Sequence, residues 1–151
     1  MTDAESFEAY DLAGRPEWKR FGSVTGPGID YGYNSTKQLT SETTFGRTLG
    51  FLLDANDNRE RLIYPDEEVI NCEYDWLNRM TFVRENWATS GPGVLALYRW
   101  DALSRRDSAN PFVRGNGTTS TYGYDAASRL SALGHDALNS GQDVSIGFGY
   151  T

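Results

Sequence analysis

The stretch that decides the fold of this chain reads Val69-Ile70-Asn71-Cys72-Glu73-Tyr74-Asp75-Trp76-Leu77-Asn78-Arg79-Met80-Thr81-Phe82. Its first half alternates, with Ile70, Cys72 and Tyr74 at a period of two, so these side chains point to one face of a β-strand. Asp75 can accept a hydrogen bond from the backbone two residues on, and Asn78 tolerates the left-handed conformation that a tight reversal needs. The residues that follow alternate again. The stretch therefore predicts a β-hairpin.

The chain contains this hairpin six times, and a seventh copy begins. An acidic or amide residue marks each turn, and these residues recur roughly every 20 to 26 positions, which is the spacing of a repeat architecture. The turns are centred at positions 11, 34, 54, 75, 101 and 125, and the seventh copy is truncated at 151. We therefore expect a single repeat domain over residues 1–151.

Most copies place an aromatic residue before the turn residue and an arginine four positions after it. The second copy departs with Asn34 and Gln38, and the third carries Leu53 before its turn and an extra loop residue near Asp57. We expect the motif residues to hold turns, since six copies of a structural staple are more natural than six copies of a catalytic site. They are Tyr10, Asp11, Arg15, Tyr33, Asn34, Gln38, Asp54, Arg59, Tyr74, Asp75, Arg79, Trp100, Asp101, Arg105, Tyr124, Asp125 and Arg129.

Two columns of aromatic and aliphatic residues run through the copies, one position and three positions before the turn residue. Tyr74 and Cys72 occupy them in the fourth copy, and Tyr124 and Tyr122 in the sixth. Strands placed side by side would bring these columns together, so we expect aromatic ladders in which each cross-strand pair contributes about 0.2–1 kcal/mol.

The recurring Tyr-Asp-x-x-Gly/Asn/Ser-Arg unit resembles the RHS repeat, also called the YD repeat, over nearly the whole chain. The most family-like part runs from Asp54 through Ile63-Tyr64-Pro65-Asp66 to Arg79. The resemblance implies an antiparallel sheet that winds into a large hollow shell. In bacterial polymorphic toxins and insecticidal complexes such a shell encloses a toxic C-terminal domain, and related arrays occur in wall-associated and cell-adhesion proteins.

The resemblance also sets expectations about partners. The remainder of a longer array and its enclosed C-terminal domain would be the partners in the parent protein. The family's shell ends in a self-cleaving Asp-Pro-x-Gly-type segment, and this sequence contains no Asp-Pro pair. Self-cleavage is therefore not expected, and the toxin domain is absent from the sequence. Six hairpins would form an arc of a wall.

Composition agrees with an all-β chain. Aromatic residues make up 13% of the 151 residues while hydrophobic residues in total make up 38%, so the apolar mass lies in rings suited to strands. The formal net charge of −7 argues against nucleic acid as a partner, because phosphate-binding surfaces need concentrated Lys and Arg.

The single Cys72 allows no internal disulfide, and its column predicts a small buried hydrophobe. The acidic stretch Met1–Ser6 is not a secretory signal. No run approaches the roughly 18 apolar residues of a membrane span. The localisation of a parent, secreted or at the cell surface, is left open by these features. No capping unit is visible after Tyr150, so we expect a piece of a larger repeat protein.

Residues with catalytic or metal-binding chemistry are sparse. Asp66, Glu67 and Glu68 could act as paired carboxylates on a glycoside, but they follow Pro65 in a predicted turn, where a solvated charge run is expected. His135 has no second histidine or cysteine to share a zinc ion, and we expect an exposed loop side chain. We therefore predict no catalytic residue, no metal and no cofactor.

These observations predict an all-β fold of tandem β-hairpin repeats that form a curved, open antiparallel sheet, a segment of a YD shell. The predicted function is structural and non-enzymatic. The alternative is a carbohydrate- or cell-surface-binding module that uses exposed aromatic rings as stacking platforms for glycans.

Overall fold

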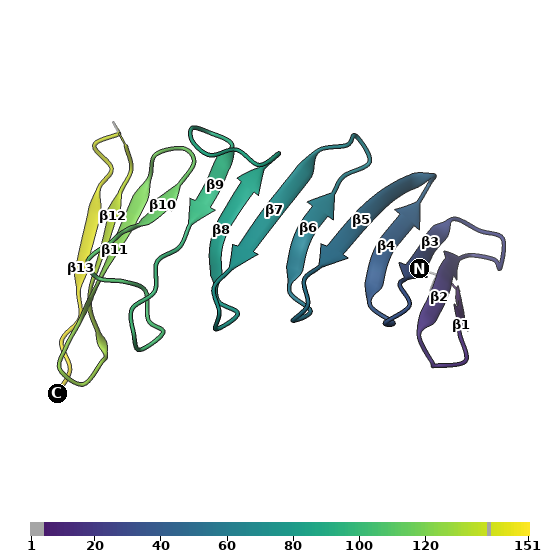
Figure 1. The fold of residues 1–151 in the computed structure, drawn as a ribbon, viewed down its shortest axis with the longest axis horizontal. Coiled ribbons are helices and arrows are strands. Elements are labelled where there is room, and N and C mark those ends of the chain that lie inside the picture. Colours follow the sequence, from purple (N-terminus) through teal and green to yellow (C-terminus); the bar gives the residue numbers. More distant parts are fainter. Residues whose placement is uncertain (1–4, 139) are drawn as a thin grey trace. The chain divides into compact units, whose positions relative to one another are not determined.

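The computed structural model describes residues 5–138 and 140–151. Over these residues the chain forms thirteen β-strands and no helix (Figure 1). Every pairing between strands is antiparallel, and strands that follow each other in sequence are neighbours in a sheet. The all-β class and the tandem hairpins predicted from the sequence are confirmed. No helix in the described part of the chain is long and apolar enough to cross a membrane.

The chain packs as two compact units, Met1–Val69 and Ile70–Thr151. Unit 1 contains three hairpins, each built from an outgoing and a returning strand, in an open sheet whose order follows the sequence. The expectation of a single domain stays a prediction. The strands are β1 (Ser6–Tyr10), β2 (Pro16–Phe21), β3 (Gly28–Tyr33), β4 (Leu39–Thr44), β5 (Arg47–Leu53) and β6 (Arg59–Ile63).

Unit 2 contains the fourth, fifth and sixth hairpins and the outgoing strand of a seventh, again in sequence order. The last strand ends at Gly147, so the predicted outgoing strand Val144–Tyr150 is shorter than expected. The strands are β7 (Val69–Tyr74), β8 (Met80–Glu85), β9 (Val94–Leu97), β10 (Phe112–Arg114), β11 (Thr119–Tyr124), β12 (Leu130–Asp136) and β13 (Val144–Gly147).

A β-bulge recurs at the same place in the hairpins. In the fourth hairpin Glu73 pairs with Phe82 and Tyr74 pairs with Met80, which leaves Thr81 as the extra residue of the returning strand. The first, second, third and sixth hairpins show the same shift of register. A bulge bends the strand that carries it and increases the local twist. The repeat therefore includes a shaped kink that alternation in the sequence does not reveal.

The fifth hairpin is interrupted after its turn. Trp100 and Arg106 form an isolated bridge, and regular pairing resumes where Leu97 meets Val113. Between them Asp107 starts a loop, since its carboxylate accepts a hydrogen bond from the backbone of Ala109 at 2.8 Å. The sequence predicted a fifth copy at this place but not the insertion within its returning strand.

Neither unit contains a second layer that covers a sheet face, within the described residues. The buried hydrophobic side chains are Phe51 and Ala96, each 8% exposed, whereas a two-layer domain buries a contiguous core. Cys72, predicted to be buried, is half-buried. Contacts along and between the strands must therefore carry much of the stability.

One fully buried side chain is polar. Asn71 on β7 has no exposed surface, and its Oδ1 accepts the backbone N–H of Trp87 at 2.9 Å. Trp87 lies in the link between β8 and β9, where both Asn86 and Trp87 have positive φ values of 45° and 63°. Asn71 thus fixes a strained link from the neighbouring strand, sixteen residues away.

Candidate functional site

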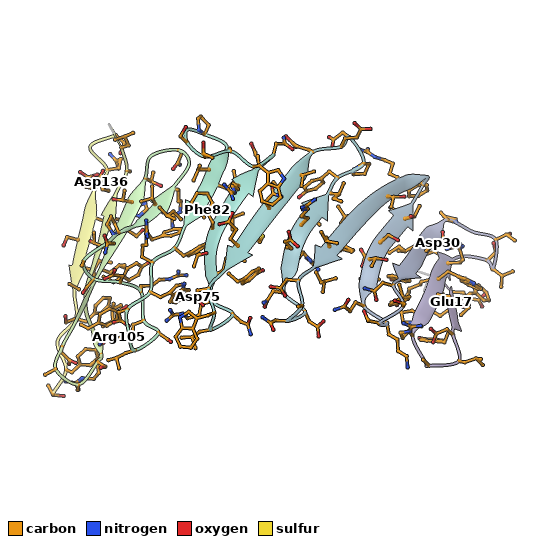
Figure 2. All side chains as sticks on the ribbon, viewed as in Figure 1. Glu17, Asp30, Asp75, Phe82, Arg105 and Asp136 are labelled. Atoms are coloured by element: carbon orange, nitrogen blue, oxygen red, sulfur yellow. The ribbon has the colours of Figure 1, made fainter. Side chains whose placement is uncertain are left out.

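The predicted motif residues gather at the ends of the strands where each outgoing strand turns back. Figure 2 shows Asp75 and Arg105 at one end of the strands of unit 2 and Asp136 toward the other end. The six turns share one backbone form, seen in the fourth hairpin. The N–H of Asp75 donates to the carbonyl of Arg79 at 2.9 Å, and the N–H of Asn78 donates to the carbonyl of Asp75 at 2.9 Å. The turns at Asp11, Asn34, Asp54, Asp101 and Asp125 make the same two bonds.

The residue three positions after the turn residue is left-handed in every copy. Its φ is 59° at Asn78, as the sequence predicted, and the column contains glycine, asparagine and serine but also lysine and aspartate. A left-handed backbone is costly for residues with a Cβ, and glycine adopts it without that penalty. The φ values are 76° at Gly14, 72° at Lys37, 65° at Asp57, 60° at Ser104 and 63° at Ser128.

Replacing Ser128 by glycine is therefore expected to raise the free energy of unfolding by about 0.5 kcal/mol, because relief of the left-handed strain exceeds the added entropy of the unfolded chain. Ala127→Gly is the matched control, since Ala127 lies one position earlier and has no positive φ. The control should lose stability. Urea unfolding followed by far-UV circular dichroism measures both, and equal losses in the two variants would contradict the strain argument.

The turn aspartate holds the reversal with both of its oxygens. In the fourth copy Oδ1 of Asp75 accepts the N–H groups of Leu77 at 2.9 Å and Arg79 at 3.0 Å, while Oδ2 accepts Nε of Arg79 at 2.7 Å. The bond from two residues on was predicted from the sequence. Asp11 with Arg15, Asp101 with Arg105 and Asp125 with Arg129 repeat all three bonds.

The second copy keeps this arrangement without charge. Oδ1 of Asn34 accepts the N–H groups of Thr36 at 3.1 Å and Gln38 at 2.9 Å, and Nδ2 of Asn34 donates to Oε1 of Gln38 at 2.6 Å. Gln38 also donates to Asp57 in the next turn. The pair Asn34 and Gln38 is therefore a neutral equivalent of the Asp–Arg pair.

The third copy corrects the sequence-based alignment. Asn58, not Arg59, lies opposite Asp54, because Nδ2 of Asn58 donates to Oδ2 of Asp54 at 3.0 Å and the backbone N–H of Asn58 donates to Oδ1 at 2.9 Å. The turn has no extra residue near Asp57, and Arg59 begins β6. Arg59 instead lies over the ring of Phe51 at 4.6 Å. Counting four positions from Asp54, as in the other copies, would have found Asn58.

Hydrogen bonds hold the pKa values of the turn aspartates below the ordinary value of 3.8. The Arg79 side chain is the main cause at Asp75, and the Asn58 side chain at Asp54. The backbone N–H of Arg15 leads at Asp11, and that of Arg129 at Asp125. Burial tends to raise the pKa of Asp101, but the bonds from Arg105 outweigh it.

A pKa that is lower in the folded chain means that folding favours the ionised carboxylate. This contribution to stability is complete above the unfolded value of 3.8 and is lost as pH falls through the lower folded values. We expect acid unfolding to set in as pH drops below about 4. Circular dichroism against pH measures the midpoint.

The matched variant copies the neutral second turn into the fourth, as Asp75→Asn with Arg79→Gln. Its stability should depend less on pH between neutrality and acid than that of the unchanged chain, because an ionisable pair has been removed from unit 2. An unchanged pH dependence would show that the turn carboxylates do not govern acid unfolding.

Each arginine also reaches the next hairpin. The guanidinium of Arg79 lies 5.6 Å from the ring centre of Trp100, which precedes the following turn. Guanidinium groups over aromatic faces are attracted by the ring quadrupole, with energies of about 0.5–1 kcal/mol at exposed sites. The same contact is 4.4 Å from Arg15 to Tyr33, 4.2 Å from Arg105 to Tyr124 and 4.3 Å from Arg129 to Tyr150.

The polar group of the covered ring bonds back to the preceding hairpin. Nε1 of Trp100 donates to the carbonyl of Met80 at 2.8 Å, and Met80 is the first residue of β8. Tyr33 donates to the carbonyl of Pro16 at 3.0 Å and Tyr150 to that of Leu130 at 2.7 Å, which are equivalent positions. We call this set of contacts, turn aspartate to arginine to next aromatic ring to preceding carbonyl, the Asp–Arg–aromatic staple.

The staple replaces the aromatic ladders expected from the sequence, and that expectation was wrong. Equivalent strands of successive hairpins are separated by a returning strand, so their rings lie about 9.5 Å apart, twice the spacing of neighbouring strands. The arginine fills this gap. Among the described residues the stacked pair of rings is Tyr98 with Phe112, at 4.8 Å within the interrupted fifth hairpin.

Trp100 has guanidinium groups from two directions. Arg106 lies 4.1 Å from its ring centre, in addition to Arg79, and also contacts the ring of Tyr98 at 4.5 Å. Sequence reasoning missed Arg106, because no other copy has an arginine directly after the motif arginine. Trp100 is therefore covered by its own chain.

The two motif tyrosines that remain differ in their surroundings. Tyr10, in the first hairpin, is 55% exposed and donates to Glu8 on its own strand. Tyr74 is half-buried and pairs with Met80 across the fourth hairpin.

The other candidate residues do not form a reactive site. His135 lies within β12, where a loop was expected, and its Nδ1 is 3.1 Å from Oγ of the buried Ser120 on β11. Asp66, Glu67 and Glu68 are exposed in a turn that closes between Tyr64 and Glu68 with the same two backbone bonds as the motif turns. The described residues contain no cluster of His, Cys, Asp or Glu that could hold a metal ion.

Comparison with known proteins gives likeness in structure alone. No protein-family model matches the chain, and no curated protein matches it significantly. The crystal structure of TcdB2-TccC3-Cdc42 has a TM-score of 0.69 at 14% identity and covers 89% of this chain and 7% of that chain. For TcdB2-TccC3-TEV the values are 0.69, 15%, 94% and 8%, and for TcdB2-TccC3 without hypervariable C-terminal region 0.58, 12%, 97% and 10%. The chain thus shares the fold of these toxin-complex chains and spans a tenth of their length or less.

Proposed function

We propose that the chain is a non-enzymatic structural segment of a hollow shell built from RHS/YD repeats, of the kind found in bacterial polymorphic toxins or wall-associated proteins. The observation that carries the proposal is the Asp–Arg–aromatic staple. It recurs at the same place in successive hairpins, and its acceptors and donors bond to one another. A staple that joins neighbours and uses up its own polar groups suits a wall.

Two further features support a wall over a globular enzyme. Each unit is a single sheet with few buried hydrophobic side chains, which suits a segment that continues into more sheet. The chain is also similar in fold to chains of the TcdB2-TccC3 complex, one form of which is described as lacking a hypervariable C-terminal region. By analogy, the partners of this chain would be the rest of an array and an enclosed C-terminal domain.

The test is the reading frame around these codons and the protein that it encodes. We expect further Tyr-Asp hairpins in frame, an Asp-Pro motif and a variable tail, and particles that are hollow in cryo-electron microscopy. The tail should resist added protease until the shell is denatured. A solid particle, or a frame without further repeats, would contradict the proposal.

The staple also bears on carbohydrate binding, the alternative function. A sugar stacks on an open ring face, whereas Arg79 and Arg106 lie over Trp100. Isothermal titration with a panel of glycans distinguishes the two functions. The shell proposal expects no saturable heat, whereas millimolar or tighter binding that Trp100→Ala abolishes would favour the binding module.

A further inference from the structure

The tips of the fourth and fifth hairpins expose large apolar side chains. Trp76 is 87% exposed, Leu77 44% and Leu103 64%. They occupy the first two positions after the turn aspartates Asp75 and Asp101, at the apex of each reversal. An apex residue has no strand of its own hairpin to cover it, so these side chains do not serve the core of the chain.

The two tips lie side by side within unit 2. Nη1 of Arg79, in the fourth turn, donates to the carbonyl of Asp101 at 3.2 Å and to Oγ of Ser104 at 3.0 Å, both in the fifth turn. Figure 2 shows Asp75 and Arg105, one from each turn, at the same end of the strands. Trp76, Leu77 and Leu103 therefore form one patch, which we call the tip patch.

The polar groups behind the tip patch are occupied. Asp75 accepts from Leu77 and Arg79, and Asp101 accepts from Leu103 and Arg105. Each carboxylate is also paired with its arginine, at 2.6 Å from Nη2 of Arg79 and 2.7 Å from Nε of Arg105. The patch thus has balanced charge and few groups left to form the polar rim that a protein interface uses, about one hydrogen bond per 100–200 Å².

Shape points the same way. Small ligands bind in concave pockets, whereas hairpin apices protrude. Trp and Leu side chains on a protruding, charge-balanced surface suit the boundary between lipid headgroups and acyl chains, where Trp is enriched and no fixed hydrogen-bond partner is required. We propose that the tip patch binds the surface of a zwitterionic lipid bilayer by inserting Trp76, Leu77 and Leu103.

The charge of the whole chain sets the lipid preference. With a formal net charge of −7, the chain is repelled by anionic headgroups, and the paired arginines behind the tip patch do not offset this. Binding should therefore be stronger to vesicles of phosphatidylcholine alone than to vesicles in which phosphatidylserine replaces part of it. The inference does not depend on the shell proposal.

Co-sedimentation of the full chain with phosphatidylcholine vesicles tests the proposal. We expect binding that Trp76→Ser with Leu103→Ser weakens by at least about tenfold, since each buried apolar side chain contributes about 1.5–3 kcal/mol. Brominated phosphatidylcholine should quench tryptophan fluorescence of the unchanged chain and quench the Trp76→Ser variant much less. The quenching experiment on the unchanged chain does not rely on a variant that folds.

The matched control is Phe45→Asn. Phe45 is 83% exposed in the link between β4 and β5, at the ends of these strands opposite the motif turns, and its φ of 48° suits asparagine. This variant should bind vesicles as the unchanged chain does. Failure of the unchanged chain to bind, equal binding by the tip variant, or binding that rises with phosphatidylserine would each overturn the proposal. Self-association that the tip variant abolishes, without vesicle binding, would make the patch a protein interface instead.

Discussion

Replacing Trp100 by alanine is expected to lower the free energy of unfolding by about 3 kcal/mol. The ring is half-buried, lies between the guanidinium groups of Arg79 and Arg106, and donates its N–H to the carbonyl of Met80. Truncation removes the ring from between two cations and leaves a carbonyl without its donor. The loss joins the cost of a cavity to that of a broken link between the fourth and fifth hairpins.

Urea unfolding monitored by far-UV circular dichroism measures this loss in the full chain. Trp76→Ala is the matched control, because Trp76 is 87% exposed and its removal should change the stability by less than about 0.5 kcal/mol. Trp100→Phe should fall between the two, since the ring is kept and the N–H is lost. If Trp100→Ala and Trp76→Ala proved equally harmless, the staple would contribute nothing to stability at this place.

Replacing Arg79 by alanine is expected to lower the free energy of unfolding by about 2 kcal/mol. Its guanidinium bonds to Asp75 in its own turn and to the carbonyl of Asp101 and Oγ of Ser104 in the next turn. The side chain is 19% exposed, so solvent screens these bonds less than those of a surface pair. Arg79→Lys should recover little, because an ammonium group cannot reproduce the planar fork that serves two turns at once.

A double-mutant cycle isolates the contact between the arginine and the ring. Arg79→Ala and Trp100→Ala should show a coupling of about 0.5–1 kcal/mol, as expected for a cation over an aromatic face in partial contact with solvent. Arg47→Ala is the control, since Arg47 is exposed at the start of β5 and should change the stability by less than about 0.5 kcal/mol. Strict additivity of the two variants would mean that the arginine acts within its own turn alone.

The staple gives a physical account of how a single sheet can be stable without a second layer. Each hairpin is closed by its own aspartate and joined to the next by an arginine and a ring, so cohesion runs along the array. Such nearest-neighbour energetics are typical of repeat proteins. They also explain why one turn can replace the Asp–Arg pair with Asn34 and Gln38, as long as both partners change together.

Interactions within five residues were determined by the sequence. The aspartate bonds to the second and fourth residues after it, so Asp75 with Leu77 and Arg79 follows from local chemistry. The left-handed Asn78 follows in the same way. These short loops place the turns, and alternation on both sides of them requires antiparallel strands. The all-β class and the hairpin series therefore needed no information beyond the chain itself.

What lies across from each ring was decided by the tertiary structure. The partner of Trp100 is Arg79, about twenty residues away, and it reaches the ring because equivalent strands are two strand spacings apart, too far for ring to meet ring. The burial of Asn71 by the link at Trp87 depends likewise on strand pairing. Pairing register and strand separation are properties of the assembled sheet, and residue columns in the sequence contain neither.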